Sequence, residues 1–196
     1  MRIVQLISTT LAVAVITGCA HPLVISPDIT KTERDTSAQP IDKNVGYYIA
    51  PETRHITVTT SGGGGEKVTY QPYKDIETAF YKMLSNVFKN VTVLKAPNDA
   101  DTINKQSISY IFTPVITTNS SSPSPFTWPP TRFTVNLTCN INDSSGKPVT
   151  SKSVTGEGQA EFGEFKSDFS LSGKRASQDA LLKMQSTLLR SPELRN

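Results

Sequence analysis

Residues that carry most enzymatic and metal chemistry are scarce in this sequence. Its 196 residues include two cysteines, two histidines and one tryptophan. Neither His21 nor His55 has a second histidine, a cysteine or a carboxylate at the spacing of a metal site. Nucleophilic catalysis needs a base beside a serine or cysteine. His55 could act as that base only if folding placed it against a serine or carboxylate in a cleft. The sequence therefore predicts no metal site and no catalytic residues, and we do not expect an enzyme.

A large excess of charge of one sign is also missing. Lysine and arginine together number 20 against 17 acidic residues, which gives a formal net charge of +3. The basic residues form no stripe and no aromatic–basic motif of the kind that binds nucleic acid. They also form no polybasic patch that would attract anionic lipid. We therefore expect no nucleic-acid partner.

Long hydrophobic runs are missing except near the start, where residues 11–16 are all apolar. This run is far shorter than the roughly 20 residues that cross a bilayer as a helix. It follows Met1 and Arg2 and precedes small residues, which is the plan of a secretory signal peptide. We assign residues 1–18 to that signal peptide.

The cysteine that follows this leader belongs to a known pattern. The tetrapeptide Ile16-Thr17-Gly18-Cys19 resembles the bacterial lipobox, in which an aliphatic residue and two small residues precede an obligatory cysteine. The resemblance implies a diacylglycerol on the Cys19 thiol, cleavage just before this residue and a further acyl chain on the new amine. Several acyl chains together anchor a protein firmly, since each buried methylene contributes about 0.8 kcal/mol. A plain signal peptide with an incidental cysteine is the alternative.

The residue after the lipobox bears on the location of the protein. It is Ala20, whereas an aspartate in this place resembles an inner-membrane retention signal of enteric-type bacteria. The resemblance therefore implies a protein that is anchored in the bacterial outer membrane and faces the periplasm. The membrane is one partner, and no cofactor is implied beyond the lipid on Cys19.

The other cysteine has no partner within the chain once Cys19 is acylated, so no internal disulfide is expected. Cys139 lies in the strand-like run "RFTVNLTCNI". We interpret it as a buried small hydrophobic residue. An intermolecular bridge in the oxidising periplasm is the alternative.

The first part of the mature chain, residues 19–44, has the composition of a flexible tether. Prolines, charged residues and small polar residues dominate it. A flexible chain of this length has a mean span of about 25–30 Å. Residues 23–25 form its one apolar patch, and they could instead pack on the domain as an added edge strand.

Residues 45–196 are expected to form a single α+β domain. The clearest element is a helix over 73–90, whose apolar residues recur at steps of three and four. A second amphipathic helix ends near Pro192. A mostly antiparallel sheet with both helices packed on one face would bury both apolar stripes. Strands are expected at 45–50, 55–60, 67–71, 91–97 and 107–118, with a long antiparallel hairpin over 132–162.

Two glycine-rich stretches need a physical explanation. The run "SGGGGE" (61–66) lies between two predicted strands and ends in Glu66 rather than in the lysine of a phosphate loop. We therefore interpret it as a mobile hairpin tip. Gly156 and Gly158 are interpreted as marking a bend or bulge within the long hairpin.

Several acidic residues follow these glycines: Glu157, Glu161, Glu164 and Asp168. Glu157 and Glu161 share strand parity, so both could project from one face. We interpret the group as the wet side of one element whose buried side carries phenylalanines. Paired carboxylates of the glycosidase type are the alternative.

A serine- and proline-rich loop over 119–131 is the feature that packing explains least. It holds Phe126, Trp128, Pro129 and Pro130. Prolines lower the entropy lost on binding, and tryptophan is enriched among interface hot spots. We interpret these four residues as a partner-binding site. In the alternative, Trp128 folds back and caps the sheet while the prolines blunt an edge.

The leader, the segment "ISPDI" (25–29) and the order of strands and helices are similar to small outer-membrane lipoproteins of the YajG type. They resemble more distantly the LpoB-like accessory lipoproteins that regulate wall synthesis. The resemblance implies a non-enzymatic accessory or assembly factor of the cell envelope that binds a protein partner. A carrier or binder of a lipid or a cell-wall glycan is the alternative.

Overall fold

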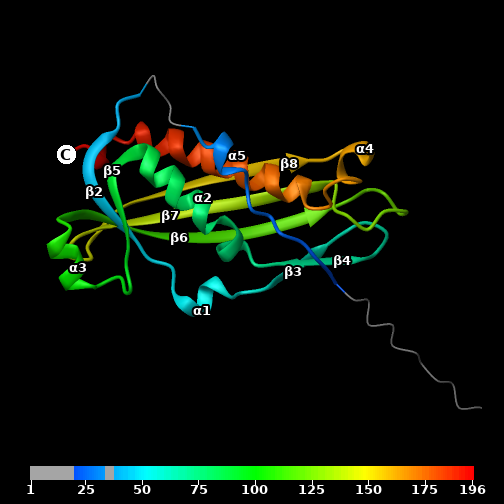
Figure 1. Cartoon of the computed structure of the whole chain (residues 1–196), viewed down its shortest axis with the longest axis horizontal. Coiled ribbons are helices and arrows are strands. Elements are labelled where there is room, and N and C mark those ends of the chain that lie inside the picture. Colours follow the sequence, from blue (N-terminus) through cyan, green and yellow to red (C-terminus); the bar gives the residue numbers. More distant parts are fainter. Residues whose placement is uncertain (1–19, 34–37) are drawn as a thin grey trace, which may run out of the picture.

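A five-stranded sheet organises the structure, a computed structural model that describes residues 20–33 and 38–196. The strand order is β5-β2-β6-β7-β8 (Figure 1). Strand β2 pairs in parallel with β5 and β6, whereas β6, β7 and β8 pair antiparallel. The predicted α+β class with a mostly antiparallel sheet is confirmed, and β7 with β8 forms the predicted hairpin. The strands are β2 (Ile41–Tyr47), β5 (Phe88–Val93), β6 (Ile108–Ser121), β7 (Arg132–Asp143) and β8 (Pro148–Gln159).

Two long helices, α2 (Pro72–Val87) and α5 (Leu171–Leu189), cover one face of this sheet, as predicted (Figure 1). The apolar stripe of α2 is buried, and Phe80, Met83 and Leu84 are each at most 1% exposed. The helix ends earlier than predicted because Phe88 has extended backbone angles, φ −114° and ψ 160°, and begins β5 directly. The return of the chain through α2 also explains why β2 and β5 are parallel, since a crossover connection brings the chain back in the same direction.

Alternation along β7 divides the sheet into a buried and an open face. Its inner residues lie under the helices and are at most 1% exposed: Phe133, Val135, Leu137, Cys139 and Ile141. The expectation that Cys139 is a buried small hydrophobic residue is confirmed. Burial raises the pKa of its thiol. This thiol is therefore part of the core rather than a reactive group.

The remaining elements are short and were not predicted. They are α1 (Pro51–Arg54), α3 (Ala100–Lys105), α4 (Phe162–Phe165) and the 3-10 helices η1 (Ile29–Lys31) and η2 (Pro192–Leu194). None is long enough to show an apolar repeat in the sequence. Ile103 of α3 nevertheless belongs to a second, smaller apolar cluster with Leu94, Ile108 and Ile111.

Gly156 and Gly158 do not mark a bulge, which corrects the sequence interpretation. The pairing of β7 with β8 runs through both residues without a register shift. A Cβ atom at Gly156 would lie 2.2 Å from the Ala176 backbone oxygen of α5, and one at Gly158 would lie 2.0 Å from the Ser172 oxygen. The two glycines therefore let the backbone of α5 lie directly on β8.

A small second sheet lies at one end of the large sheet, with strand order β1-β4-β3. Strands β3 (Val58–Ser61) and β4 (Lys67–Tyr70) form the predicted hairpin, and β1 (His21–Pro22) pairs with β4 in parallel. Hydroxyl groups join the two sheets: the Tyr70 oxygen lies 2.8 Å from Thr118 Oγ1, and Thr60 Oγ1 lies 2.5 Å from Ser120 Oγ.

Residues 20–33, predicted as part of a flexible tether, pack along the domain and are called the N-terminal strap here. The side chains of Leu23 and Ile25 are 6% and 0% exposed. The Leu23 amide donates to the Thr69 carbonyl at 2.8 Å, and the Ile25 amide donates to Asp75 Oδ2 at 3.1 Å. The patch 23–25 thus packs on the domain, and the folded part includes residues well before residue 45.

The far end of the strap is held by buried amides of both long helices. Asn86 of α2 is 3% exposed and donates to the Thr32 carbonyl at 2.8 Å. Gln185 of α5 accepts a second bond from Asn86 at 2.9 Å and donates to the Glu33 carbonyl at 2.9 Å. Because buried amides need such partners, the strap satisfies polar groups of the helix interface as well as covering apolar ones.

The signal peptide and the lipobox residues Ile16, Thr17, Gly18 and Cys19 lie outside the described residues. Within the described part of the chain, no helix has the length and apolar character of a membrane span.

Candidate functional site

The four residues predicted to bind a partner have three different environments. Trp128 is half-buried: its ring stacks on His21 at a centroid distance of 4.1 Å and 21° between planes, and it lies 4.8 Å from the Phe169 ring. Pro129 and Pro130 are buried. Phe126 is 94% exposed. For Trp128 the structure shows the alternative arrangement, a cap over this end of the fold, and only Phe126 of the four projects freely.

The glycine-rich tip of the β3–β4 hairpin is hydrogen-bonded to the backbone of the 119–131 loop. The Gly63 amide donates to the Trp128 carbonyl at 2.9 Å, and the Gly64 amide donates to the Ser124 carbonyl at 3.0 Å. A Cβ at Gly62 would lie 2.3 Å from the Trp128 oxygen, and one at Gly63 would lie 1.8 Å from the Thr127 oxygen. The run of glycines is therefore a docked tip rather than a mobile one, because only glycine allows so close an approach of two backbones.

Apolar side chains remain exposed around Trp128, and we call this group the aromatic end. Phe162 is 56% exposed, Phe169 47% and Val24 55%. The Val24 amide donates to Ser170 Oγ at 3.2 Å, which places the strap beside Phe169. Helix α4, the β6–β7 loop and the first described residues lie at the same end of the molecule (Figure 1). The members are Val24, Phe126, Trp128, Phe162 and Phe169.

The acidic residues near this end have structural roles. Glu161 is not on β8 but caps α4, where its side chain and that of Glu164 form a reciprocal capping box. Glu164 also binds Arg175 at 2.7 Å, and hydrogen bonds from that guanidinium lower the pKa of Glu164 to about 2. Asp168 binds Lys174 at 2.8 Å. The strand parity assumed for Glu157 and Glu161 is thus wrong, because β8 ends at Gln159.

His55, the one candidate base, ends the short helix α1 and is exposed. Among the described residues, its ring has no hydrogen bond to a serine or a carboxylate, so the structure does not bring a base and a nucleophile together there. In the same part of the chain, no group of His, Cys, Asp or Glu is arranged to hold a metal ion.

The face of the large sheet opposite the long helices carries short polar side chains, and we call it the outer sheet face. Hydrogen bonds run across it between strands: Thr155 Oγ1 donates to Asn136 Oδ1 at 2.7 Å, and Thr138 Oγ1 lies 2.9 Å from Ser153 Oγ. All of its side chains are exposed or half-buried. Two charged residues, Arg132 of β7 and Glu157 of β8, lie on this face at the end next to the β6–β7 loop, and the other side chains are uncharged. They are Thr113, Val115, Thr117 and Asn119 of β6, Thr134, Asn136, Thr138 and Asn140 of β7, and Ser151, Ser153 and Thr155 of β8.

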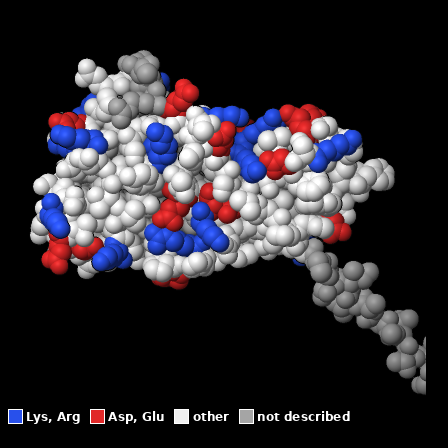
Figure 2. Space-filling model, viewed as in Figure 1, with Lys and Arg blue, Asp and Glu red and all other residues white. Residues whose placement is uncertain are grey.

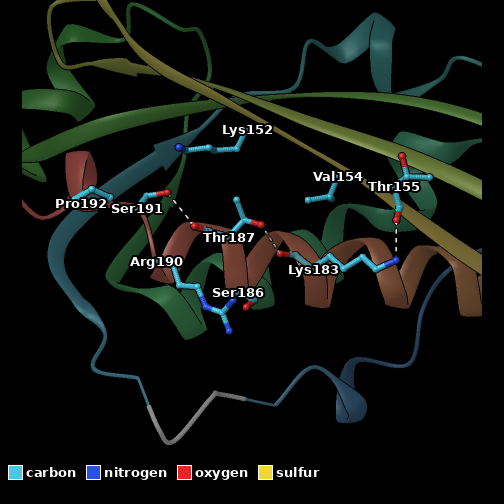
Figure 3. Close-up of a pocket in the computed structure, with 9 residues that line it drawn as sticks. All are labelled: Lys152, Val154, Thr155, Lys183, Ser186, Thr187, Arg190, Ser191 and Pro192. Carbon is cyan, nitrogen blue, oxygen red and sulfur yellow. Dashed lines mark hydrogen bonds between the residues drawn. The ribbon is translucent and has the colours of Figure 1, made fainter.

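A hollow of about 630 Å³ lies between β8 and the end of α5, and Figure 3 shows its lining. Lys183 reaches from α5 to the Thr155 carbonyl at 3.0 Å and also binds Asp179 at 2.7 Å. Lys152 binds Glu193. Arg190 is exposed, and its guanidinium has no hydrogen-bonding or ion-pairing partner among the described residues.

Charges of both signs are mixed on one face of the molecule. On the face in view in Figure 2, lysine and arginine alternate with aspartate and glutamate, and neither sign covers a broad area. Among the described residues of this face there is no stripe of basic residues of the kind that a nucleic-acid interface uses.

The sequence contained signals for part of this site. The alternation of Thr134, Asn136 and Thr138 with buried residues marks a polar face of β7. It does not say that this face stays uncovered. The exposure of Phe162 and Phe169 had no signal of its own, because phenylalanine is usually buried.

The chain was compared with known families, curated proteins and solved structures. No protein-family profile and no curated protein matches the chain. Among solved structures, the chain is similar to protein XCC0632 from Xanthomonas campestris, described as a member of the family DUF330. The two are 10% identical with a TM-score of 0.46, and the match covers 87% of this chain and 94% of that chain.

Proposed function

We propose that this protein is a lipid-anchored, non-enzymatic lipoprotein of the bacterial outer membrane that binds an envelope protein as an accessory or assembly factor. Two sequence features support the anchor: the resemblance of Ile16-Thr17-Gly18-Cys19 to a lipobox, and a layout similar to lipoproteins of the YajG type. The lipid would be a diacylglycerol on the Cys19 thiol and an acyl chain on its amine. With Ala20 next, the domain would face the periplasm from the outer membrane.

The outer sheet face is the observation that carries the binding role. The helices cover the inner face of the sheet, whereas three long strands present mainly hydroxyl and amide side chains outward. Charged residues are depleted in the centre of protein interfaces, and an interface makes about one hydrogen bond per 100–200 Å². The centre of this face is uncharged and rich in donors and acceptors, with Arg132 and Glu157 confined to one end, so it meets both conditions.

The environments of the reactive groups support a non-enzymatic role. Glu164 and Asp168 are engaged by Arg175 and Lys174. His55 lies apart from these groups at the end of α1. A general acid or base must be free to reach its substrate in a suitable protonation state. Carboxylates that are held in ion pairs beside a helix instead stabilise the fold.

The binding role is tested by photo-crosslinking in intact cells. A crosslinking amino acid replaces Thr138 at the centre of the outer sheet face, and the control position is the exposed Lys82 on α2. We expect a specific protein adduct from position 138 that the position on α2 does not give. An Asn136→Glu change should abolish the adduct without lowering the melting temperature, whereas a Lys82→Glu change should leave the adduct intact. Equal capture from both positions would argue against this surface.

The anchor is tested separately by mass spectrometry of the mature protein. We expect a chain that begins at Cys19 and carries three acyl chains, by the chemistry that the lipobox resemblance implies. A Cys19→Ser chain should instead be recovered in the soluble fraction.

A carrier or binder of a cell-wall glycan is the second candidate. Arg190 has no partner among the described residues and lies beside the hollow of about 630 Å³, which favours an anionic ligand such as a muropeptide carboxylate over a lipid. Muropeptides that co-purify with the wild-type protein but not with an Arg190→Ala variant would support this candidate. Their equal recovery with both would exclude this hollow.

A further inference from the structure

The first described residues connect the proposed lipid to the aromatic end with very little chain between them. Only Ala20 separates Cys19 from His21, and successive Cα atoms are 3.8 Å apart, so the Cα atoms of Cys19 and His21 lie within about 8 Å of each other. His21 stacks on Trp128 at 4.1 Å and pairs with Val68 in β4. A lipid on Cys19 would therefore join the fold beside Trp128.

The strap removes the slack that a flexible tether would provide. Ile25 is fully buried, and a Cβ on Gly173 of α5 would lie 2.4 Å from its Cγ2 atom. Together with the backbone bonds of Leu23 and Ile25 described above, this packing fixes the chain from β1 onward. A tether of 26 residues could hold the domain some 25–30 Å away from a bilayer, whereas the strap keeps this end of the domain next to its anchor.

The side chains at this end suit a membrane interface. Phe126 is 94% exposed, and Phe162 and Phe169 are about half exposed. Contiguous apolar patches on a soluble surface mark interaction sites, and aromatic rings concentrate at the level of lipid headgroups. The Lys166 ammonium lies over the Phe162 ring, with Nζ 4.6 Å from the ring centroid.

Two of the acidic groups at this end are held in ion pairs, which reduces the charge that would oppose an approach to lipid. Glu164 and Asp168 bind Arg175 and Lys174 at 2.7 and 2.8 Å. Glu66 lies 3.6 Å from His21. Because Arg175 and Lys174 are engaged by these carboxylates, apolar contact rather than attraction to anionic lipid would hold the surface.

We propose that the aromatic end rests on the periplasmic leaflet of the bilayer in which Cys19 is anchored, with the exposed rings, Phe126 foremost, at headgroup depth. The inference rests on the proposed lipidation of Cys19. It adds an orientation: the long axis of the sheet points away from the membrane, and the opposite end, with α3 and the C-terminus, extends into the periplasm (Figure 1).

The experiment uses Trp128, the single tryptophan of the chain, as its reporter. The lipidated mature protein is reconstituted in phosphatidylcholine vesicles that contain lipid with a doxyl quencher either near the headgroup or at the end of an acyl chain. We expect the shallow quencher to reduce Trp128 emission more than the deep one. Because contact is apolar, added salt should not restore the emission.

Two variants separate contact by the rings from mere proximity. Phe126→Ser removes the most exposed ring and leaves the contacts of Trp128 with His21 and Phe169, so it should reduce the loss of emission caused by the shallow quencher. Val149→Ser is the matched control: Val149 is 36% exposed at the opposite end of β8, and its loss should change nothing. Thermal melts of both variants check that the fold is retained.

The outcomes distinguish this inference from the proposed function. If mass spectrometry shows three acyl chains and the protein stays with the vesicles, but neither quencher affects Trp128, the orientation is wrong and the anchor stands. Quenching that is the same in Phe126→Ser as in the wild type would overturn contact through this ring. A protein without lipid on Cys19 that does not join the vesicles would overturn both the anchor and the orientation.

Discussion

Truncation of one strap residue, Ile25→Ala, tests whether residues 20–33 belong to the folded domain. Ile25 is 0% exposed and lies against Gly173 of α5. Its backbone amide is bound by Asp75 Oδ2 at 3.1 Å. The substitution leaves this hydrogen bond in place, so its effect reports on the side-chain packing alone.

The expected loss follows from the carbons removed. Isoleucine to alanine removes three carbons, and about 0.8 kcal/mol for each gives about 2.4 kcal/mol. The cavity left between the strap and α5 adds to this value, so we expect a loss of about 3 kcal/mol in the free energy of unfolding, within the range of about 2–5 for such changes. For a domain of this size the melting temperature should fall by about 6–12 °C.

Urea unfolding of the mature chain, followed by Trp128 emission, measures this loss. The adjacent Val24→Ala change is the matched control, because Val24 is 55% exposed and should cost at most about 0.5 kcal/mol. If the Ile25 variant is as stable as the Val24 variant, the strap is not part of the folded domain. The close anchoring of the aromatic end would then lose its physical basis.

Three further predictions concern the rest of the fold. Gly156→Ala should destabilise the protein by about 3 kcal/mol in thermal or urea unfolding, because the added Cβ would meet the α5 backbone. Gly163→Ala is the control: an added Cβ there has no atom within 4 Å, so the change should be neutral or stabilising by up to about 1 kcal/mol. Glu164→Gln should be less stable than the wild type at neutral pH. The free energies of unfolding of the two proteins should converge as the pH falls from 4.5 to about 2, because Glu164 paired with Arg175 becomes protonated only in that range. A difference in stability that stays constant over this range would refute the pairing. Cys139 should react with thiol reagents only as fast as the protein unfolds, since it is fully buried; fast labelling of the native protein would contradict its place in the core.

Local patterns were enough to predict the main elements. The steps of three and four that contain Phe80 and Met83 predicted α2, and the alternation around Leu137 predicted β7 with an inward and an outward side. Both patterns report how one segment divides between core and solvent, which is a property of neighbouring residues. The same reasoning predicted that Cys139 would be buried.

Contacts between distant segments decided what local patterns could not. The residues around Leu23 read as a tether because their composition is polar, yet Asn86 and Gln185, on two different helices, bind carbonyls of this segment. Gly63 was predicted to lie in a mobile tip and Gly156 in a bend or bulge, yet each is needed where another backbone passes too close for a Cβ. Burial depends on which surfaces meet in three dimensions, and the residues of one segment do not show which other segment will pack on it.

The sequence by itself determined the α+β class, the two amphipathic helices, the long hairpin and the candidate lipid anchor at Cys19. Only the tertiary structure decided that Trp128 caps the fold while Phe126 projects from it, and that the strap leads to the same end. The reason is physical: residue type and spacing set local structure, but the exposure of a ring depends on whether another element happens to cover it.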